Sequence, residues 1–557
     1  MAKVSGGELL VRTLIKAGVK QTFGLHGAHL ETLFQACLDH DIPILDTRHE
    51  VAAGHAAEAY ARATNTLGVA MVTAGPGFTN CVTSITNAYL DRTPVLYIAG
   101  SSGLAQAESN TLQAGFDQFA VAKPITKWTI RITVPEQIPR LVAEAVRIAT
   151  SAPSGPVLLD MPSDVLGALV DEEKAPIPET IVLDSPAAPT AAAVRQTLDI
   201  LQAAERPVIM LGAGAWRSGC GDELKTFVET TGIPVFSDFQ AHGMLPSSDP
   251  RYGGTFHKMD DLRALDAQPD AVLALGVRFG LFTLGGSERL VPHSAKLIHV
   301  EVDPKEIGLV RDVTLPVVAD SREMLKALNV AATKIKSWPD RGDFVRTIRE
   351  ARRKRFAQFD EAMKKAGPPM HPIQAVSAIV ESIPKDTVII GDGAEAYHWL
   401  NEVIRQDRGG SYITHGFLGT VGMGLGLSLG AQVANPNRRV LCLEGDGAVG
   451  FTITEFDTMT NHELPIVVLI MNNHSWGASQ HFQEIVSGAN RVTGTQLSDA
   501  RYHDVAEAFG ANGYHVTDIK ALGPTIKEAF ASGKPCCINV EIDLQPVPPE
   551  VGMLMSR

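Results

Sequence analysis

The feature that most constrains this fold is a recurring alternation of short apolar segments with helix-like stretches, which occurs in three series along the 557 residues. The apolar segments include GVAMVTAG (68–75), PVLYIAG (94–100), RPVIMLGAGA (206–215), AVLALGVRFG (271–280), RRVLCLEGDG (438–447) and LPIVVLIMNN (464–473). Strands that alternate with helices pack as parallel sheets with helices on both faces. The sequence therefore predicts an α/β protein of three doubly wound parallel-sheet domains.

Composition changes mark the domain boundaries. We expect domains at residues 1–180, 190–335 and 365–557. The stretch 171–193 is rich in proline, acidic residues and alanine and is typical of a linker, and the charged segment 343–365 with the break GPPMHP (367–372) predicts a second connector. The proline-marked tail QPVPPEVGMLMSR (545–557) is predicted to be irregular.

Charge and cysteine usage limit the partners and the compartment. The net charge of −13 argues against nucleic acid or an anionic membrane surface as a partner, because both attract basic surfaces. No apolar run reaches the ~18 residues of a membrane span, and the N-terminus is not typical of a signal peptide. The six cysteines are scattered, which favours reduced, buried thiols in a cytoplasmic protein.

A glycine–aspartate turn follows an apolar segment of the third series and opens a predicted helix. Gly445 and Gly447 let backbone N–H groups approach a phosphate, and the helix that begins near Ala448 favours negative charge at its start. Alone this turn is a weak signal, but Asn472–Asn473 ends the next strand after a single helix, which is far more specific. The pair predicts a diphosphate site.

The same two strand ends supply oxygen ligands for a hard cation. Asp446 offers a carboxylate, Asn473 a side-chain amide oxygen and Ser475 a backbone carbonyl. A few such oxygens with diphosphate and water complete an octahedral magnesium site. The sequence therefore predicts Asp446, Asn473 and Ser475 as metal ligands.

In this motif the chain resembles the thiamine-diphosphate enzyme superfamily, in which GDG is followed about two dozen residues later by NN. The resemblance extends over the whole chain, and it implies a pyrimidine-binding domain (1–180), a central domain (190–335) and a diphosphate-binding domain (365–557), with thiamine diphosphate and Mg²⁺ as cofactors. It also implies a homo-oligomer, either a dimer or a homotetramer, because each cofactor of the family lies between two subunits.

The resemblance assigns cofactor contacts outside the GDG motif. Glu50, in the sequence DTRHE (46–50), would hydrogen-bond the pyrimidine ring and so promote ionisation of the cofactor. It follows the segment PILDTR (43–48) at a strand-to-helix turn, where sites of α/β proteins form. In HGFLGTVGMGLG (415–426), the carbonyl of Gly419 would accept from the cofactor, and Val421 would be the apolar wedge that bends it.

Within the superfamily the chain is most similar to the benzaldehyde lyases, which cleave and form aromatic 2-hydroxy ketones. The resembling stretches are GLHGAH (24–29), ESNTLQAG (108–115), PITKW (124–128), WPDRGD (338–343), HGFLG (415–419) and MNNHSWGASQHFQ (471–483). The resemblance makes His29 the acid–base group and Gln113 the residue that holds the substrate hydroxyl. It places Ala28, Tyr397, His415, Ala478 and Phe482 in the substrate pocket.

Three pocket positions depart from the benzaldehyde lyase pattern. Ser163 replaces a large aromatic residue, His398 an aliphatic one, and Val421 a bulkier wedge. The pocket is therefore expected to be larger and more polar, which suits an expanded or polar aldehyde, or an acyl-CoA. A paired His-His motif and a glutamate after the NN segment, both typical of pyruvate decarboxylases, are missing, and Ala478 stands at the glutamate position.

These features predict a carbon–carbon lyase and carboligase that acts on aldehydes and benzoin-type 2-hydroxy ketones. A 2-hydroxyacyl-CoA lyase and an acetolactate synthase-like enzyme remain as alternatives, as does a paralogue that binds the cofactor only for structure, against which Glu50 argues. Whether the central domain holds a nucleotide is open. Arg278, Asp303 and Asp320 lie at predicted strand ends where a family nucleotide would sit.

Overall fold

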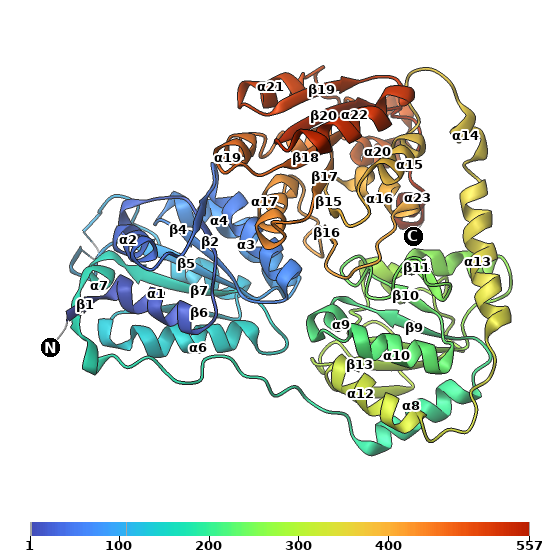
Figure 1. Cartoon of the computed structure of the whole chain (residues 1–557), viewed down its shortest axis with the longest axis horizontal. Coiled ribbons are helices and arrows are strands. Elements are labelled where there is room, and N and C mark those ends of the chain that lie inside the picture. The colour runs from blue at the N-terminus through green and yellow to red at the C-terminus, as the bar shows by residue number, and fades with distance from the viewer. Residues whose placement is uncertain (1–2, 107–108, 556–557) are drawn as a thin grey trace.

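A computed structural model describes residues 3–106 and 109–555, except the side chains of 554 and 555. It has three domains, each with a six-stranded parallel sheet between helices (Figure 1), so the predicted fold class is confirmed. The last two residues of the tail, 556–557, and residues 1–2 and 107–108 lie outside the described part of the chain.

In the first domain the strand order is β3 (Ile44–Asp46), β2 (Thr22–Gly24), β4 (Gly68–Val72), β5 (Val95–Ser101), β7 (Val157–Pro162) and β6 (Trp128–Arg131). Its helices are α1 (Gly6–Lys16), α2 (Glu31–Asp39), α3 (Glu50–Thr64), α4 (Pro76–Leu90), α5 (Gln118–Ala122), α6 (Ile138–Thr150) and α7 (Ser163–Gly167). A small antiparallel pair, β1 (Lys3–Ser5) with β8 (Leu169–Asp171), closes the domain.

In the central domain the order is β11 (Tyr252–Thr255), β10 (Val235–Ser237), β9 (Pro207–Leu211), β12 (Ala271–Leu275), β13 (Lys296–Glu301) and β14 (Leu315–Val318). Its helices are α8 (Ala191–Ala203), α9 (Ala213–Ser218), α10 (Gly221–Thr231), α11 (Asp260–Arg263) and α12 (Ser321–Ala332). This strand order, 3-2-1-4-5-6 in chain order, is that of dinucleotide-binding folds.

In the third domain the order is β16 (Tyr412–Thr414), β15 (Val388–Gly391), β17 (Val440–Gly445), β18 (Ile466–Asn472), β20 (Cys536–Glu541) and β19 (Asn512–Val516). Its helices are α15 (Pro372–Ser382), α16 (Ala394–Val403), α17 (Gly424–Ala434), α18 (Asp446–Val449), α19 (Glu455–Asn461), α20 (Gly477–Ser487), α21 (Tyr502–Ala508), α22 (Ile519–Ser532) and α23 (Pro549–Met555). The first and third sheets therefore share one topology, 2-1-3-4-6-5.

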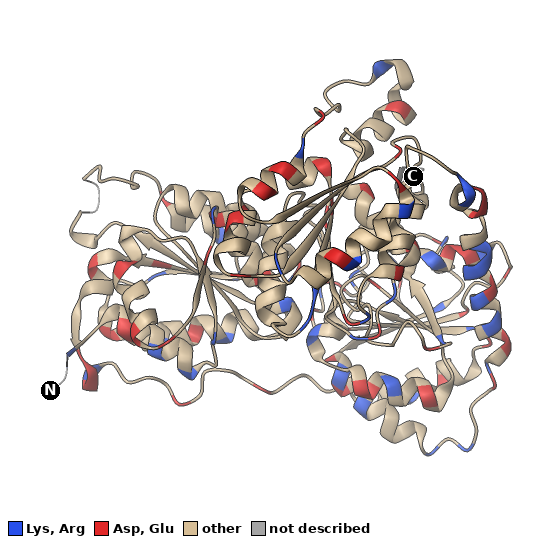
Figure 2. Ribbon diagram, turned by 45° about the horizontal axis from the view of Figure 1, so that its top comes forward, with Lys and Arg blue, Asp and Glu red and all other residues tan. Residues whose placement is uncertain are grey.

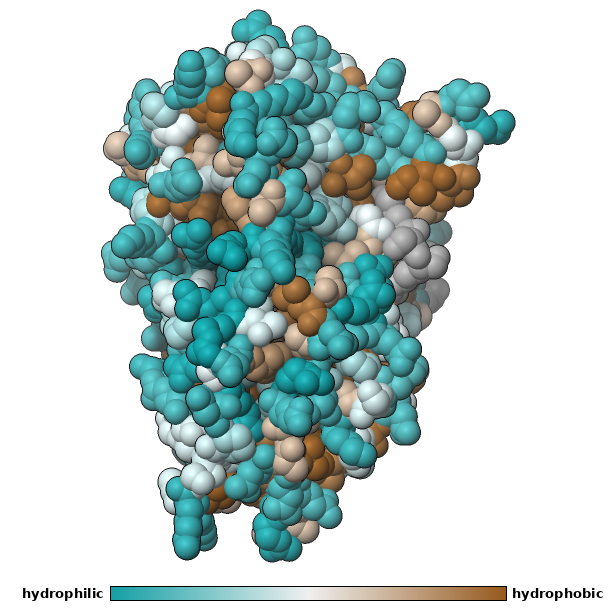
Figure 3. All heavy atoms as spheres, turned by 90° about the vertical axis from the view of Figure 1, so that its right-hand side faces the viewer, coloured by the Kyte–Doolittle hydropathy of each residue, from teal (hydrophilic) through white to brown (hydrophobic). Residues whose placement is uncertain are grey.

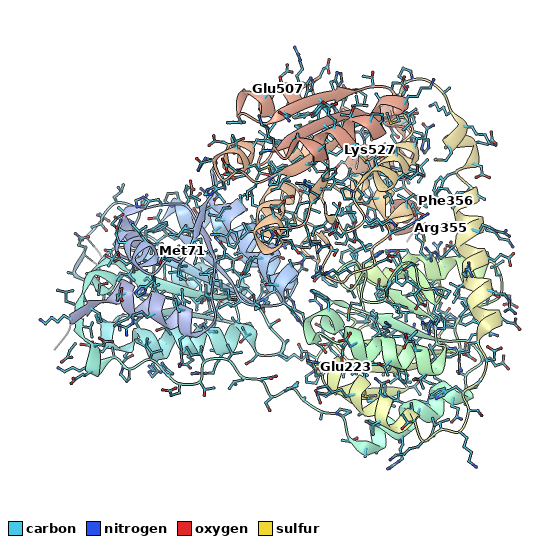
Figure 4. The ribbon with its side chains drawn as sticks, in the orientation of Figure 1. Met71, Glu223, Arg355, Phe356, Glu507 and Lys527 are labelled. Carbon is cyan, nitrogen blue, oxygen red and sulfur yellow. The ribbon has the colours of Figure 1, made fainter. Side chains whose placement is uncertain are left out.

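Two connectors join the domains. An extended linker runs from the first to the central domain, and α13 (Gly342–Ala357) with α14 (Asp360–Lys364) leads along the outside to the third domain (Figure 1). Arg355 of α13, labelled in Figure 4, donates to both carboxylate oxygens of Glu402 in α16, each at 2.6–2.7 Å. A buried bidentate pair of this kind fixes the connector against the third domain.

The surface is mixed in charge and largely polar. Acidic and basic residues are distributed over all three domains (Figure 2), and the face that carries α13 is mostly hydrophilic with scattered apolar side chains (Figure 3). Among the described residues no helix is long and apolar enough to cross a bilayer. All six cysteines are free and buried, as predicted.

The proline-marked tail is irregular only at residues 545–548, so that prediction is wrong for the rest of its described part. Pro549–Met555 form α23, with Pro549 at the helix start, where its missing N–H costs no hydrogen bond. Glu550 and Val551 are buried at 1% and 5% exposure, so tertiary contacts hold the segment in place. Proline at a helix start and proline in a loop look alike in sequence.

The first and third domains meet through α3 and α17, which lie side by side in the middle of the molecule (Figure 1). Small residues let the two backbones approach. A Cβ atom on Gly426 would lie 3.1 Å from the Cα of Ala52, and one on Gly430 would lie 1.9 Å from the carbonyl oxygen of Ala56. Because the obstacle at Gly430 is backbone, a side chain there forces the helices apart.

We therefore expect Gly430→Ala to destabilise the protein by about 1–3 kcal/mol, the usual range for overpacking. Gly221→Ala is the matched control, because Gly221 begins α10 and a Cβ there meets nothing within 4 Å. That control should be neutral or slightly stabilising, since alanine favours helix more than glycine does. The melting temperatures of the two variants measure this difference in stability. Equal values would show that the close contact at Gly430 does not contribute to stability.

Candidate active site

A cavity of about 360 Å³ opens at the carboxyl edge of the third sheet, where the strand order reverses between β15 and β17. Ligands of open α/β sheets bind at such switch points. Gly393 follows β15 with φ +73°, and a Cβ atom on it would lie 3.0 Å from the backbone nitrogen of Gly445. The two turns thus form a floor built of backbone.

The predicted metal ligands come together on this floor. Asp446 is 3% exposed; its Oδ2 accepts from the backbone N–H of Ser475 at 3.1 Å and its Oδ1 from that of Gly447 at 3.1 Å. The Oδ1 of Asn473 also accepts from the Ser475 N–H, at 3.1 Å. Burial raises the pKa of Asp446 to about 6, so the charge of this buried carboxylate is not fully compensated by neighbouring groups. A buried, oxygen-only donor set fits Mg²⁺.

Most of the predicted third-domain site residues line this cavity. They are Tyr397, His398, His415, Gly419, Val421, Gly445, Asp446, Gly447, Ala448, Asn473, Ser475 and Ala478. Phe482 is different, since it lies on α20 with 53% of its surface exposed and does not line the cavity. Helix α20 directs the Phe482 side chain outward. The sequence alone did not show which side of this helix Phe482 occupies.

His415 is a neutral hydrogen-bonding group of the wall. Burial lowers its pKa to about 4. Its Nδ1 lies 3.2 Å from the carbonyl oxygen of Gly416, so Nδ1 carries the hydrogen and donates. The other nitrogen, Nε2, is therefore an acceptor.

Sequence reasoning missed two groups beside the metal ligands. Trp476 lies over the GDG turn, and a Cβ atom on Gly447 would come within 2.6 Å of its ring. Glu395 of α16 lines the cavity and pairs with Nδ1 of His481 at 2.6 Å. A Cβ on Gly477 would meet the Glu395 carboxylate at 2.7 Å. For Trp476 the sequence holds one signal, its position next to Ser475. For Glu395 it holds none, because Glu395 belongs to a distant segment.

The first domain carries a second group of predicted residues at its own switch point, between β2 and β4. Nδ1 of His29 lies 3.1 Å from Oγ1 of Thr73, and burial lowers the pKa of His29 below its ordinary value of 6.5. The imidazole is therefore neutral near pH 7 and able to accept a proton. Gln113 has φ +62° and packs on Gly75, where a Cβ would lie 2.8 Å from that of Gln113.

Ala28 and Ser163 belong to this first-domain group. Ala28 is exposed at the turn after β2, and Ser163 is half-buried at the start of α7. Neither lines the third-domain cavity of its own chain. That Ala28 and Ser163 line the substrate pocket therefore stays a prediction, and it requires the pocket to be that of a neighbouring subunit.

Glu50 is the first residue of α3 and is 8% exposed. Its Oε2 accepts from Nδ2 of Asn80 at 2.9 Å. The turn before it is held by the third domain, because the backbone N–H of Arg48 donates to both oxygens of Glu455 at 3.1 and 3.2 Å. Asn80 and Glu455 are further residues that sequence reasoning missed.

The two groups do not meet within one chain. Among the described residues, none from 1–180 lines the third-domain cavity. The cavity loop is nevertheless anchored to its own first domain: Oγ1 of Thr420 donates to Asn87 at 3.0 Å, and the N–H of Phe417 donates to Asp91 at 3.0 Å. Each chain thus holds both half-sites rigidly but apart.

The central-domain residues considered for a nucleotide have protein partners. Arg278 donates to the carbonyl of Leu90 at 2.6 Å and covers the ring of Phe417. Asp303 pairs with Arg92 at 2.8 Å, and Asp320 caps α12. All three therefore serve contacts between elements of the protein itself.

Comparison with known proteins settles the family. Models of the thiamine pyrophosphate enzymes match three segments: the N-terminal TPP binding domain at residues 4–121, the central domain at 194–328 and the C-terminal TPP binding domain at 392–540. The chain belongs to the thiamine pyrophosphate enzyme family. Thiamine diphosphate and Mg²⁺ are its cofactors, as predicted.

Curated relatives extend over nearly the whole chain. A probable acetolactate synthase large subunit of Methanocaldococcus jannaschii is 30% identical over 560 residues, covering 98% of this chain and 94% of the relative. Acetolactate synthase isozyme 3 large subunit of Escherichia coli is 29% identical over 544 residues, with 95% and 93% covered. Human 2-hydroxyacyl-CoA lyase 2 is 30% identical over 551 residues, with 91% and 84% covered. These names match the alternatives predicted from sequence better than the benzaldehyde lyase prediction.

We expect Asp446→Asn to lower the affinity for thiamine diphosphate in the presence of Mg²⁺ at least about 100-fold, because the asparagine lacks the charge that a buried cation requires. Calorimetric titration of the cofactor, with and without Mg²⁺, measures the loss. Asp504→Asn is the control, since Asp504 is 39% exposed and its surface ion pairs contribute little. Unchanged Mg²⁺-dependent binding by Asp446→Asn would exclude this residue as a ligand.

Proposed function

We propose that this enzyme is a lyase and carboligase for 2-hydroxy carbonyl compounds, breaking and forming the bond between a carbonyl carbon and a hydroxyl-bearing carbon. Its proposed substrates are aldehydes and benzoin-type 2-hydroxy ketones. The reaction is redox-neutral: cleavage removes the hydroxyl proton, breaks one carbon–carbon bond and returns one proton to the acyl carbon. A homo-oligomer, either a dimer or a tetramer, is part of the proposal.

The observation that carries the proposal is the charge of the cavity. The described residues that line it include the carboxylates Glu395, Asp446 and Asp543 but neither lysine nor arginine. A 2-oxo acid such as pyruvate brings a carboxylate that finds no cation on these walls, whereas a neutral aldehyde or ketone is not repelled. This favours neutral substrates over the 2-oxo acids of acetolactate synthesis.

The chain's own residues supply the proton handling. Thiamine diphosphate, when bound, supplies a carbon nucleophile that adds to carbonyl groups. Glu50 would hold the proton at the pyrimidine ring, and Asp446, Asn473 and Ser475 would hold the magnesium. His29 would accept the substrate hydroxyl proton, as its lowered pKa permits, and Gln113 would orient that hydroxyl.

The separated half-sites support an oligomer. Beside each half-site lie exposed apolar side chains: Leu112 (83%) and Phe116 (43%) in the first domain, Leu418 (36%) and Phe451 (60%) in the third. A subunit contact at these half-sites would cover these apolar side chains. We propose that a second chain brings its first domain to the third-domain cavity, so that Glu50 and Asp446 of one site come from different subunits.

Co-expression of Glu50→Gln and Asp446→Asn chains tests this arrangement. Each variant alone should be inactive. With random pairing, half of the dimers are mixed, and each mixed dimer carries one site with both native groups, so about a quarter of the wild-type activity should return. No recovery in mixed dimers, confirmed by differently tagged chains, would show that one chain supplies both groups.

A substrate panel tests the reaction itself. With Mg²⁺ and thiamine diphosphate, we expect release of benzaldehyde from benzoin at a kcat/KM at least about tenfold above that for pyruvate, because the described residues of the cavity wall offer the pyruvate carboxylate neither lysine nor arginine. Glu50→Gln should abolish turnover of every substrate, which separates enzyme chemistry from background. Faster use of pyruvate than of benzoin would overturn the proposal.

A 2-hydroxyacyl-CoA lyase is the second candidate, because the human relative carries that name. The reacting end of a 2-hydroxyacyl-CoA is also a neutral 2-hydroxy carbonyl, so the lack of lysine and arginine among the described residues of the cavity does not disfavour it. Formyl-CoA released from a 2-hydroxyacyl-CoA in the same panel would select this candidate over the benzoin-type ketone.

A further inference from the structure

A buried cluster of two histidines and one glutamate lies behind the substrate cavity. Glu550 comes from α23, which lies between α16 and the central domain (Figure 1), and is 1% exposed. Its Oε2 accepts from Nδ1 of His398 at 2.5 Å and from Nδ2 of Asn401 at 3.2 Å. Its Oε1 faces Nδ1 of His257, in the short helix η6 (Phe256–Met259) of the central domain.

Three segments far apart in sequence therefore converge on one carboxylate. Burial by itself would raise the pKa of Glu550, but the charge of His257 and the hydrogen bond from His398 hold it well below its usual range, so the group is ionised. Buried ionic clusters are weak devices for stability, because well-packed apolar residues serve as well or better. The position of this one, against a cavity wall, points instead to a role in arranging that wall.

The hydrogen bonds in the cluster have a defined direction. An ionised carboxylate only accepts, so Nδ1 of His398 must donate to Glu550. One buried carboxylate compensates one positive charge; with that charge on His257, the closer partner, His398 is neutral and its Nε2 is the acceptor. This atom lies 2.7 Å from the hydroxyl oxygen of Tyr397. The hydroxyl hydrogen of Tyr397 is thereby engaged, and only its oxygen lone pairs remain for a bound molecule.

Tyr397 and His398 both line the cavity, so this direction decides what the wall can recognise. Tyr397 is 2% exposed and packs edge-on against His415 with ring centroids 4.5 Å apart, which leaves its ring little freedom. A tyrosine that can only accept favours a ligand that donates, such as a hydroxyl group. It disfavours an ether or carbonyl oxygen at the same place.

We propose that Glu550 is a positioning residue that acts through His398 to make Tyr397 a hydrogen-bond acceptor, which selects substrates that present a hydroxyl group to this wall. The inference rests on the proposed function for the identity of the substrate but not for the hydrogen-bond direction. It makes the C-terminal helix part of the specificity apparatus and explains why His398 carries a polar side chain in an otherwise largely apolar part of the pocket.

Ligand binding tests the direction without any turnover. The probes are benzyl alcohol, which donates a hydrogen bond, and benzyl methyl ether, which cannot. Calorimetric titration of the cofactor-loaded enzyme should show that the alcohol binds about five- to tenfold more tightly than the ether, as expected for one hydrogen bond. Tyr397→Phe should reduce that ratio to about one. A wild-type ratio of one would overturn the proposal, even if benzoin is cleaved.

Variants of the cluster test the chain of contacts. His398→Leu frees the Tyr397 hydroxyl hydrogen, so the ether should gain affinity and the ratio should fall. Glu550→Leu should act in the same way, whereas Glu550→Gln, whose amide oxygen still accepts from His398, should retain the wild-type ratio. If Glu550→Leu does not fold, His398→Leu and Glu550→Gln still decide. An unchanged ratio in His398→Leu would refute the role of the cluster.

A double-mutant cycle on turnover separates positioning from general loosening. Tyr397→Phe and His398→Leu should each lower kcat/KM for benzoin about tenfold, and the double variant should lose no more than either single one, because both remove the same interaction. Additive losses would mean that His398 acts independently of Tyr397. If wild-type enzyme cleaves no benzoin, the proposed function fails, and the alcohol-to-ether ratio still decides this inference.

Discussion

The close contact of α3 with α17 is the interaction on which the rest of this structure depends. Gly426 and Gly430 allow the backbone of one domain to touch that of the other at Ala52 and Ala56. Helix α3 begins at Glu50, and α17 follows directly on the loop that carries Gly419 and Val421. A few small residues therefore set the spacing between the proposed activating carboxylate and the neighbouring cofactor loop.

Buried polar contacts complete what the small residues begin. Arg62 of α3 donates to the carbonyl of Thr414 at 2.8 Å, and Asn87 donates to both oxygens of Glu58. Removing one partner of such a network would strand a buried charge, so these contacts resist separation of the first domain from the 414–420 loop. The chain is thus a rigid holder of two half-sites, and the proposed association of chains completes each site.

Much of the fold was predictable because buried parallel strands are continuous apolar runs. The segments 68–75, 206–215, 271–280 and 438–447 each contain a strand of the observed sheets. The missed strands, such as β2, β16 and β19, are three to five residues long and carry no distinctive run or alternation. The tail helix α23 was missed because its stability comes from burial of Glu550 and Val551 and not from its own propensity.

By itself, the sequence determined the cofactor chemistry: GDG and NN at successive strand ends place oxygen ligands at one sheet edge, since parallel strands present their carboxyl ends together. Through the resemblance to known families it also marked Glu50 and His29. Only the tertiary structure decided which of these groups share a cavity, because that depends on domain packing. The alignment of Tyr397, His398, His257 and Glu550 was equally beyond sequence, since up to 293 residues separate its members and no local pattern connects them.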